Sequence, residues 1–122
     1  MKLTNNQIYT YATNINVAFQ DFNQRLPVKV NFYFQKNRET LSELAQSIEK
    51  ARIDLLSNYG DLDYENNRFS IRPECMEIAT KELADLFSLE QEVNIYKVSI
   101  DSFGDDLSLT TGQMEALLFM ID

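Results

Sequence analysis

The chain has 122 residues, of which 44% are apolar and 25% are charged. This composition is typical of one soluble globular domain, residues 1–122, and excludes a disordered chain. Histidine is absent and Cys75 is the single cysteine, which excludes the usual Ser-His and Cys-His nucleophile pairs and argues against a zinc site. We therefore expect a protein that is not an enzyme and binds no cofactor or metal ion.

Charge is divided unevenly along the chain, whose net charge is −8. Residues 1–60 contain seven Lys or Arg and five Asp or Glu, whereas residues 61–122 contain four and fourteen. A half this acidic repels phosphate, so we expect no direct binding to nucleic acid. It would attract a basic protein surface, although a solvated face that keeps the chain in solution explains the same charges.

Two further features bear on location. No window approaches about eighteen consecutive apolar residues, so we expect no membrane-spanning helix. The polar stretch after Met1 does not match a signal peptide, and a single cysteine cannot form an internal disulfide. We therefore expect a cytoplasmic protein.

The first predicted helix begins at Thr4. The Thr4 side chain can cap the first turn, and Gln7, three residues later, can reach back to form a capping box. Leu3 and Ile8 occupy the positions of a hydrophobic staple. The helix is expected to end at about Asn23. Its apolar face is formed by Ile8, Tyr11, Ala12, Ile15, Phe19 and Phe22.

The longest predicted element runs from Pro27 to Gly60. Its apolar residues recur at steps of three and four for about eight turns, which is the period of one helical face. Pro27 suits a helix start and Gly60 a helix end. The alternation within Val28–Phe34 is also typical of a strand, so a short strand before the helix is the alternative. The expected buried stripe is Val30, Tyr33 or Phe34, Asn37, Leu41, Leu44, Ala45, Ile48, Ala51, Leu55 and Tyr59.

The middle of the chain predicts shorter elements. Residues 61–72 suit a small hairpin or a loop, and Pro73 begins an amphipathic helix. Val93–Ile100 is the best strand candidate, with residues 68–72 or Val28–Phe34 as its partner. The sequence thus predicts a helix-dominated α+β fold with a long helical hairpin, two further helices and a small β element.

The last predicted helix follows a second capping box, formed by Thr110 and Gln113. Its apolar face carries Met114, Leu117, Leu118 and Ile121, whereas Phe119 and Met120 point elsewhere. Large apolar side chains left exposed together usually mark a partner surface. The alternative is a helix wedged between the two long ones and buried on both sides. The predicted partner-binding residues on this helix are Met114, Leu118, Phe119 and Met120.

Acidic residues give two further candidates. Asp61, Asp63 and Glu65 are spaced like the start of a calcium loop, but Asn66 stands where that loop needs glycine. An acidic turn is the better interpretation. The second candidate is a loop that we predict to contribute to partner binding by charge, or to mimic DNA charge together with Glu90 and Glu92. Its residues are Asp101, Asp105 and Asp106.

Rings and cations occur together near the start of the long helix, as they do in proteins that bind single-stranded nucleic acid. The rings are not spaced as a stacking platform and the net charge opposes that function, so packing in the core is the favoured explanation. The residues are Lys29, Phe32, Tyr33, Phe34, Lys36 and Arg38.

Five stretches are familiar as a set: KLTNNQIYTYA, LPVKVNFYFQKN, LLSNYG, EVNIYKVSI and MEALLFMID, in that order. Together they resemble a family of short acidic proteins of uncharacterised function that phages and prophages of Gram-positive bacteria encode. The resemblance spans nearly the whole chain, from about Lys2 to Asp122. It implies a phage context inside the host cell during infection, and it brings no catalytic residues with it.

Three functions follow as hypotheses. The leading one is a non-enzymatic module that binds a host or phage protein and modulates, or is sensed by, a host anti-phage defence system. The second is a small assembly chaperone or adaptor in phage morphogenesis, for which homo-oligomerisation would be the signature. The third is an acidic DNA mimic that inhibits a nucleic-acid-binding host protein.

Overall fold

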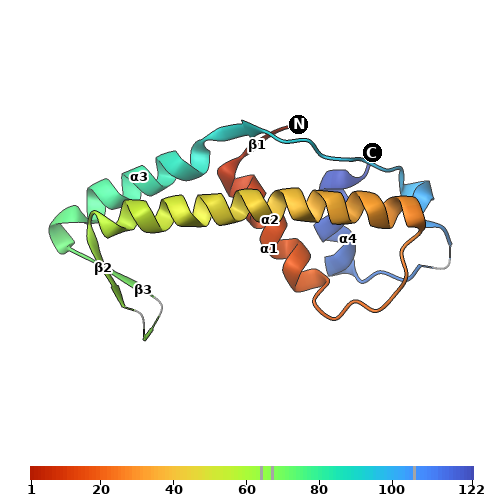
Figure 1. The fold of residues 1–122 in the computed structure, drawn as a ribbon, viewed down its shortest axis with the longest axis horizontal. Coiled ribbons are helices and arrows are strands. Elements are labelled where there is room, and N and C mark those ends of the chain that lie inside the picture. Colours follow the sequence, from red (N-terminus) through yellow and green to blue (C-terminus); the bar gives the residue numbers. More distant parts are fainter. Residues whose placement is uncertain (64, 67, 106) are drawn as a thin grey trace.

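One helix, α2, runs along most of the molecule (Figure 1). It extends from Val28 to Ser57, 30 residues without a break, or about 45 Å at the rise of an α-helix. The predicted long helix is therefore confirmed, and the strand alternative for Val28–Phe34 is wrong. Pro27 immediately precedes the helix as its N-cap. The computed structural model describes residues 1–63, 65–66, 68–105 and 107–122.

The other elements are all shorter than α2. The helices are α1 (Asn5–Ala18), α3 (Met76–Ser88) and α4 (Thr111–Leu117), with 3-10 turns η1 (Pro73–Cys75), η2 (Ile100–Phe103) and η3 (Leu118–Met120). The strands are β1 (Lys2–Thr4), β2 (Gly60–Asp63), β3 (Arg68–Ile71) and β4 (Glu90–Glu92). The described part of the chain thus has the helix-dominated α+β fold that the sequence predicts.

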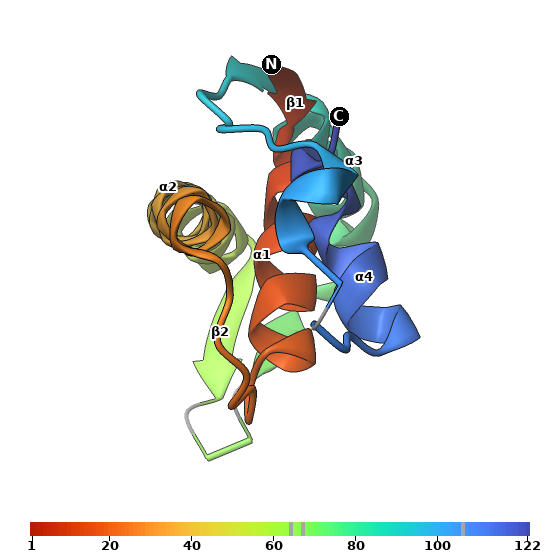
Figure 2. The ribbon, with the colours of Figure 1, turned by 90° about the vertical axis from the view of Figure 1, so that its right-hand side faces the viewer.

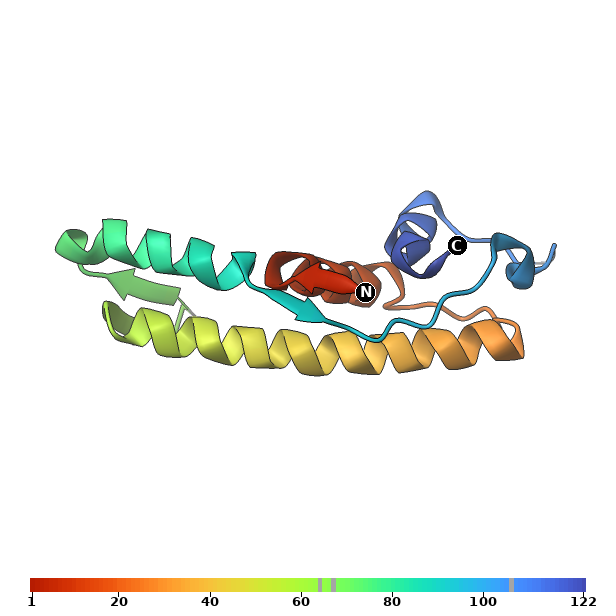
Figure 3. The ribbon, with the colours of Figure 1, turned by 90° about the horizontal axis from the view of Figure 1, so that it is seen from above.

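The shorter helices cover one side of α2. Seen from above, α3, α1 and α4 follow one another along it (Figure 3). The end view places α1 between α2 and α4 (Figure 2). The main core lies where α1, α4 and the N-terminal part of α2 meet, and it includes Ile8, Ile15, Val30, Leu41 and Leu117. Both termini lie on the same edge of the molecule (Figure 1).

Two small antiparallel sheets complete the fold. β2 pairs with β3, with Gly60 opposite Ile71, so the predicted hairpin is confirmed. β1 pairs with β4, joining the N-terminus to the chain after α3. The predicted strand at Val93–Ile100 is wrong: this described segment is extended and forms one parallel bridge, from Val98 to Ile121.

The first helix is shorter than predicted. α1 ends at Ala18 rather than at about Asn23. Beyond it the chain turns, so that the Phe19 ring lies 4.9 Å from the ring of Phe34 and 5.0 Å from that of Phe22. This aromatic cluster packs the end of α1 against α2.

Both predicted capping boxes are confirmed. The Thr4 hydroxyl accepts the Gln7 N–H at 3.1 Å, while the Gln7 side chain accepts the Thr4 N–H at 2.9 Å. Thr110 and Gln113 make the same pair of bonds at 3.1 and 3.0 Å. Gln113 also donates to the Ala18 carbonyl at 3.1 Å, so the second box holds α4 against the end of α1.

Asn37 fastens the extended segment to α2. Its side chain is fully buried, donates to the Tyr96 carbonyl at 2.8 Å and accepts the Tyr96 N–H at 2.8 Å. Its amide nitrogen also lies 3.6 Å from the sulfur of Met120. The Asn37 side chain therefore gives Tyr96 the backbone partners that a neighbouring strand would otherwise provide, which is consistent with residues 93–99 lying outside a sheet.

Replacing Asn37 tests this fastening. Asn37→Leu keeps the volume but leaves the N–H and C=O of Tyr96 without their partner, so we expect the free energy of unfolding to fall by about 2–3 kcal/mol in a urea titration. Asn31→Leu, at an exposed position of the same helix, should change it by less than about 0.5 kcal/mol. Equal losses in the two variants would contradict this role for Asn37.

Gly60 does not end α2, which stops at Ser57, but begins β2. A Cβ atom at Gly60 would lie 2.9 Å from the Cα of Ile71 and closer still to the carbonyl oxygen of Ser70. The close approach of the paired strands therefore requires glycine here. By contrast, a Cβ atom at Gly112 in α4 would meet its nearest neighbour, the Thr110 hydroxyl, at 4.0 Å.

The two glycines should respond oppositely to alanine. Gly60→Ala is expected to lower the free energy of unfolding by about 1–3 kcal/mol, because the strands must move apart. Gly112→Ala should raise it by up to about 1 kcal/mol, because alanine favours the helix and meets no obstruction. Thermal or urea unfolding of both variants measures this. A neutral Gly60→Ala would show that the hairpin tolerates a wider spacing.

Candidate functional site

The terminal helix is not an exposed anchor. Phe119 stacks on Tyr11 of α1, with ring centroids 5.2 Å apart, and Met120 is fully buried. The prediction that these two side chains are exposed as a partner surface is wrong. The alternative, that they are buried, is confirmed. The reason is local. α4 ends at Leu117 and the chain continues as η3, a 3-10 turn with about three residues per turn. Met120, three residues after Leu117, therefore points to the same buried side as Leu117. Leu118 is left 59% exposed.

The remaining residues predicted to bind a partner are scattered. Met114 is half-buried on α4. Asp101 in η2 and Asp105 beyond it are exposed, and Asp106 lies outside the described residues. The two glutamates of β4 are separated from η2 by seven extended residues, about 23 Å, and their carboxylates lie 3.4 Å from cations of the N-terminal strand region. The structure does not bring these carboxylates together.

An apolar groove between α2, the β2–β3 hairpin and α3 is the candidate site that sequence reasoning missed. Its volume is about 420 Å³. Leu56 and Ala79 form a buried floor, whereas Met76 at the rim is 51% exposed. We call this the distal groove. Its apolar lining consists of Ile53, Leu56, Leu62, Phe69, Ile71, Met76, Ala79 and Leu83.

The groove is open because the helices of the main core do not extend this far along α2 (Figures 1 and 3). The C-terminal end of α3 packs on α1, where Phe87 meets Tyr9 edge to face and Asn5 donates to the Leu86 carbonyl at 2.9 Å. At its other end α3 meets the hairpin and α2. A two-stranded hairpin covers little apolar area, so the side chains there stay half-buried.

Each wall of the groove has a signal in the sequence. Leu62, Phe69 and Ile71 alternate with polar residues, and Met76, Ala79 and Leu83 repeat at helical spacing. These patterns identify apolar faces. They do not reveal that the three faces meet one another past the end of α1, whose Tyr9 donates a hydrogen bond to Glu49 at the edge of the groove. That arrangement depends on the length of α2.

An ion pair lies at the edge of the groove. Arg52 binds Glu49 through two contacts of 2.6 and 2.9 Å, and the hydrogen bond from Arg52 holds the pKa of Glu49 below its usual value. Elsewhere in the same lobe, hydrogen bonding to the Glu82 carboxylate raises the pKa of the Tyr59 hydroxyl. Residues 48–88, which form this lobe, contain five Lys or Arg and nine Asp or Glu, a net charge of −4.

The opposite end of α2 carries an exposed apolar pair. Val28 and Phe32, one turn apart, are 80% and 55% exposed, and the Lys36 ammonium lies 5.8 Å from the centre of the Phe32 ring. Packing in the core is confirmed for Phe34 and wrong for Phe32. Residues 22–38 contain four basic and no acidic side chains. We call this surface the proximal patch: Val28, Phe32, Arg25, Lys29, Lys36 and Arg38.

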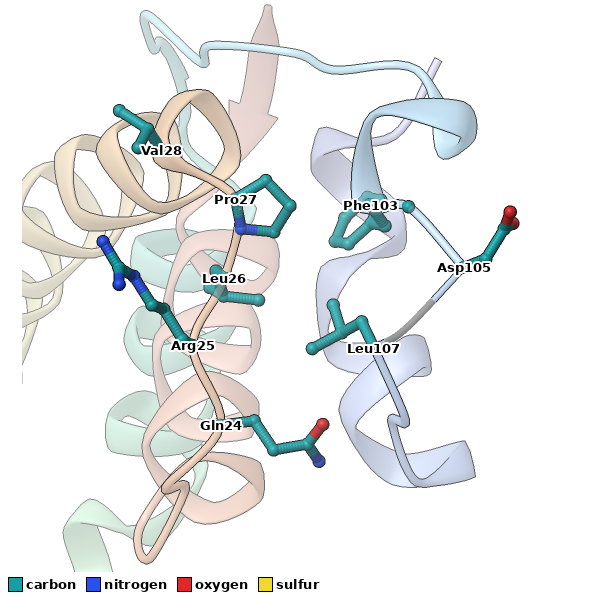
Figure 4. A pocket seen from close by; sticks show the side chains of 9 residues that line it. Gln24, Arg25, Leu26, Pro27, Val28, Phe103, Asp105 and Leu107 are labelled. Carbon is teal, nitrogen blue, oxygen red and sulfur yellow. The ribbon is translucent and has the colours of Figure 1, made fainter.

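A larger cleft, about 600 Å³, lies beside the proximal patch. Leu26 faces Phe103 and Leu107 across it, whereas Asp105 points away (Figure 4). Two of its lining residues, Asp105 and Leu107, flank position 106, which is outside the described residues. The distal groove, whose described lining is mostly apolar and comes from α2, the hairpin and α3, is the better candidate for a binding site.

The distal groove presents apolar side chains between charged edges, an arrangement suited to binding a partner. Among the described residues, no cluster of His, Cys, Asp and Glu is placed to hold a metal ion. None of the helices in the described ranges combines the length and apolarity needed to cross a bilayer. No protein-family model matches the chain, and comparison with curated proteins and with solved structures also found no match. The resemblance to phage proteins stays a prediction from the sequence.

We expect the Glu49–Arg52 ion pair to add a small amount to the free energy of unfolding, and to lose this contribution at acidic pH. Because the folded-state pKa of Glu49 is lowered from 4.5, the stabilisation is complete above that value and is lost as the pH falls through the folded-state pKa. Both side chains are 34% exposed, so we expect the contribution to be about 0.5 kcal/mol.

Urea unfolding of the wild type and of Glu49→Gln between about pH 7 and pH 3 measures this contribution. The wild type should be more stable at neutral pH, and the difference should shrink as the pH falls. Comparing the two proteins cancels the contribution of Asp63, whose lowered pKa acts over the same range. A difference that does not change with pH would show that the ion pair contributes nothing.

Proposed function

We propose that the chain is a non-enzymatic protein-interaction module whose distal groove docks an apolar segment of a phage or host protein. The single observation that carries the proposal is the lining of the groove. Its apolar side chains are gathered from three elements and are mostly half-buried over a buried floor, and Met76 is exposed at the rim. Apolar surface that stays accessible between polar edges is typical of a partner-binding site.

The charge of the surrounding lobe supports a partner segment with positive charge beside its apolar anchor. The lobe has a net charge of −4, and charge complementarity selects partners and speeds their association. An amphipathic helix with basic flanks has this chemistry and suits a groove between a helix and a hairpin. The anchor predicted at the terminal helix is thereby replaced by the distal groove.

The phage setting of this function rests on the sequence resemblance alone. In that setting, a small acidic module that occupies the binding segment of another protein would modulate a host anti-phage defence system, or would be recognised by it. The DNA-mimic alternative gains no support, because its carboxylates are spread along an extended segment and two of them lie beside cations.

Two neighbouring positions of α3 test the groove. Met76→Asp places a charge at its rim and should abolish capture of the partner from cells infected with, or lysogenic for, the encoding phage. Ile78→Asp is the matched control, since Ile78 is 46% exposed and lies outside the groove lining; its captured proteins should equal those of the wild type.

A second readout does not need the partner. Nile red, a neutral dye that fluoresces on apolar surfaces, should bind the wild type and Ile78→Asp alike and bind Met76→Asp several-fold more weakly. Both exposed substitutions should leave the circular dichroism spectrum unchanged. If Met76→Asp captures the same proteins and binds the dye as the wild type does, the groove is not the docking site.

A further inference from the structure

We propose that the distal groove of one copy of the chain receives the proximal patch of a second copy, so that copies join head to tail. The inference rests on the proposed use of the groove and names its occupant. The chemistry expected of that occupant is an apolar anchor on a helix with positive flanks, and the chain itself carries such a segment.

The first argument is charge. Residues 22–38, around the proximal patch, contain four basic side chains and no acidic one, whereas residues 48–88, around the distal groove, have a net charge of −4. The two segments are therefore opposite in sign and equal in magnitude, and the described charged side chains in the groove lining itself are Glu49, Arg52 and Arg68. This stands out in a chain of net charge −8, where an average surface would repel its own copy.

The second argument is the shape of the anchor. Val28 and Phe32 stand one helical turn apart and are largely exposed, so they form an apolar ridge. An exposed aromatic side chain that enters a pocket is typical of the residues that dominate binding energy. The cations beside the ridge would then face the acidic lobe that contains the groove, whose exposed carboxylates include Asp61 and Glu77.

The third argument is distance. Phe32 and Leu56 lie on one unbroken helix, 24 residues apart, which corresponds to about 36 Å. The patch therefore cannot reach the groove of its own chain. Copies joined in line leave one patch and one groove free at the ends, so they build rings or open filaments. Two copies lying antiparallel can instead make both contacts at once, which closes a symmetric dimer.

Sedimentation velocity on the intact chain tests this assembly. Between about 1 and 300 μM, the wild type should change from 14.2 kDa monomers to larger species. Raising the salt concentration from about 0.05 to 0.5 M should weaken assembly at least several-fold, because salt screens the attraction between the charged ends. Assembly that strengthens with salt would instead indicate non-specific apolar association between acidic chains.

Variants identify the two surfaces. Phe32→Asp and Met76→Asp should each stay monomeric alone, while an equimolar mixture should form a 1:1 complex and stop there, because one member supplies an intact groove and the other an intact patch. Val17→Asp is the control: Val17 is 70% exposed and lies on α1, outside both surfaces, so this variant should assemble like the wild type.

The remaining outcomes overturn the inference. A wild type that stays monomeric over the whole range would exclude self-association through these surfaces. A mixture that stays monomeric, although the wild type assembles, would exclude the pairing of patch with groove. If either occurs while Met76→Asp still loses the captured partner and Ile78→Asp retains it, the groove binds another protein and the proposed function stands. If Met76→Asp captures as the wild type does, the proposed function fails as well.

Discussion

The architecture follows from the length of one helix. α2 spans about 45 Å, whereas α1, with 14 residues, spans less than half of that. A helix buries its apolar stripe only where another element covers it. The chain therefore covers α2 in two portions: α1, with α4 packed on its far side, over the N-terminal part, and α3 with the β2–β3 hairpin over the other. The first portion makes a closed core, and the second leaves an accessible groove.

Features that depend on neighbours in the sequence were predictable. Both capping boxes join residues three positions apart, so the helix starts at Thr4 and Thr110 can be predicted without any knowledge of tertiary contacts. The stripe along α2 identified Val30 and Leu41 as core residues, and even placed the polar Asn37 on the buried side. Periodicity locates a face; it does not say which element will cover it.

The errors share one cause, which is the dependence of a segment on distant partners. Val93 and Val98 are buried as a strand pattern predicts, yet Asn37 and the C-terminus satisfy this segment in place of a sheet. The actual strand, β4, has the polar sequence Glu-Gln-Glu and exists because β1 pairs with it. In η3 a tighter winding changes which side chains point inward, so Phe119 enters the core. Local propensity decides none of these outcomes.

The candidate site escaped prediction for the same reason, and charge shows how the fold gives a sequence pattern its meaning. Along the sequence, the acidic half looks like a solvated face. In space, the basic residues 22–38 and the acidic residues 48–88 lie at opposite ends of α2, each beside exposed apolar side chains. If α2 were broken, the two ends could fold together and neutralise each other within one chain. Because the helix is continuous, each end keeps its charge and its apolar surface available, and in the proposed assembly each is met by another molecule.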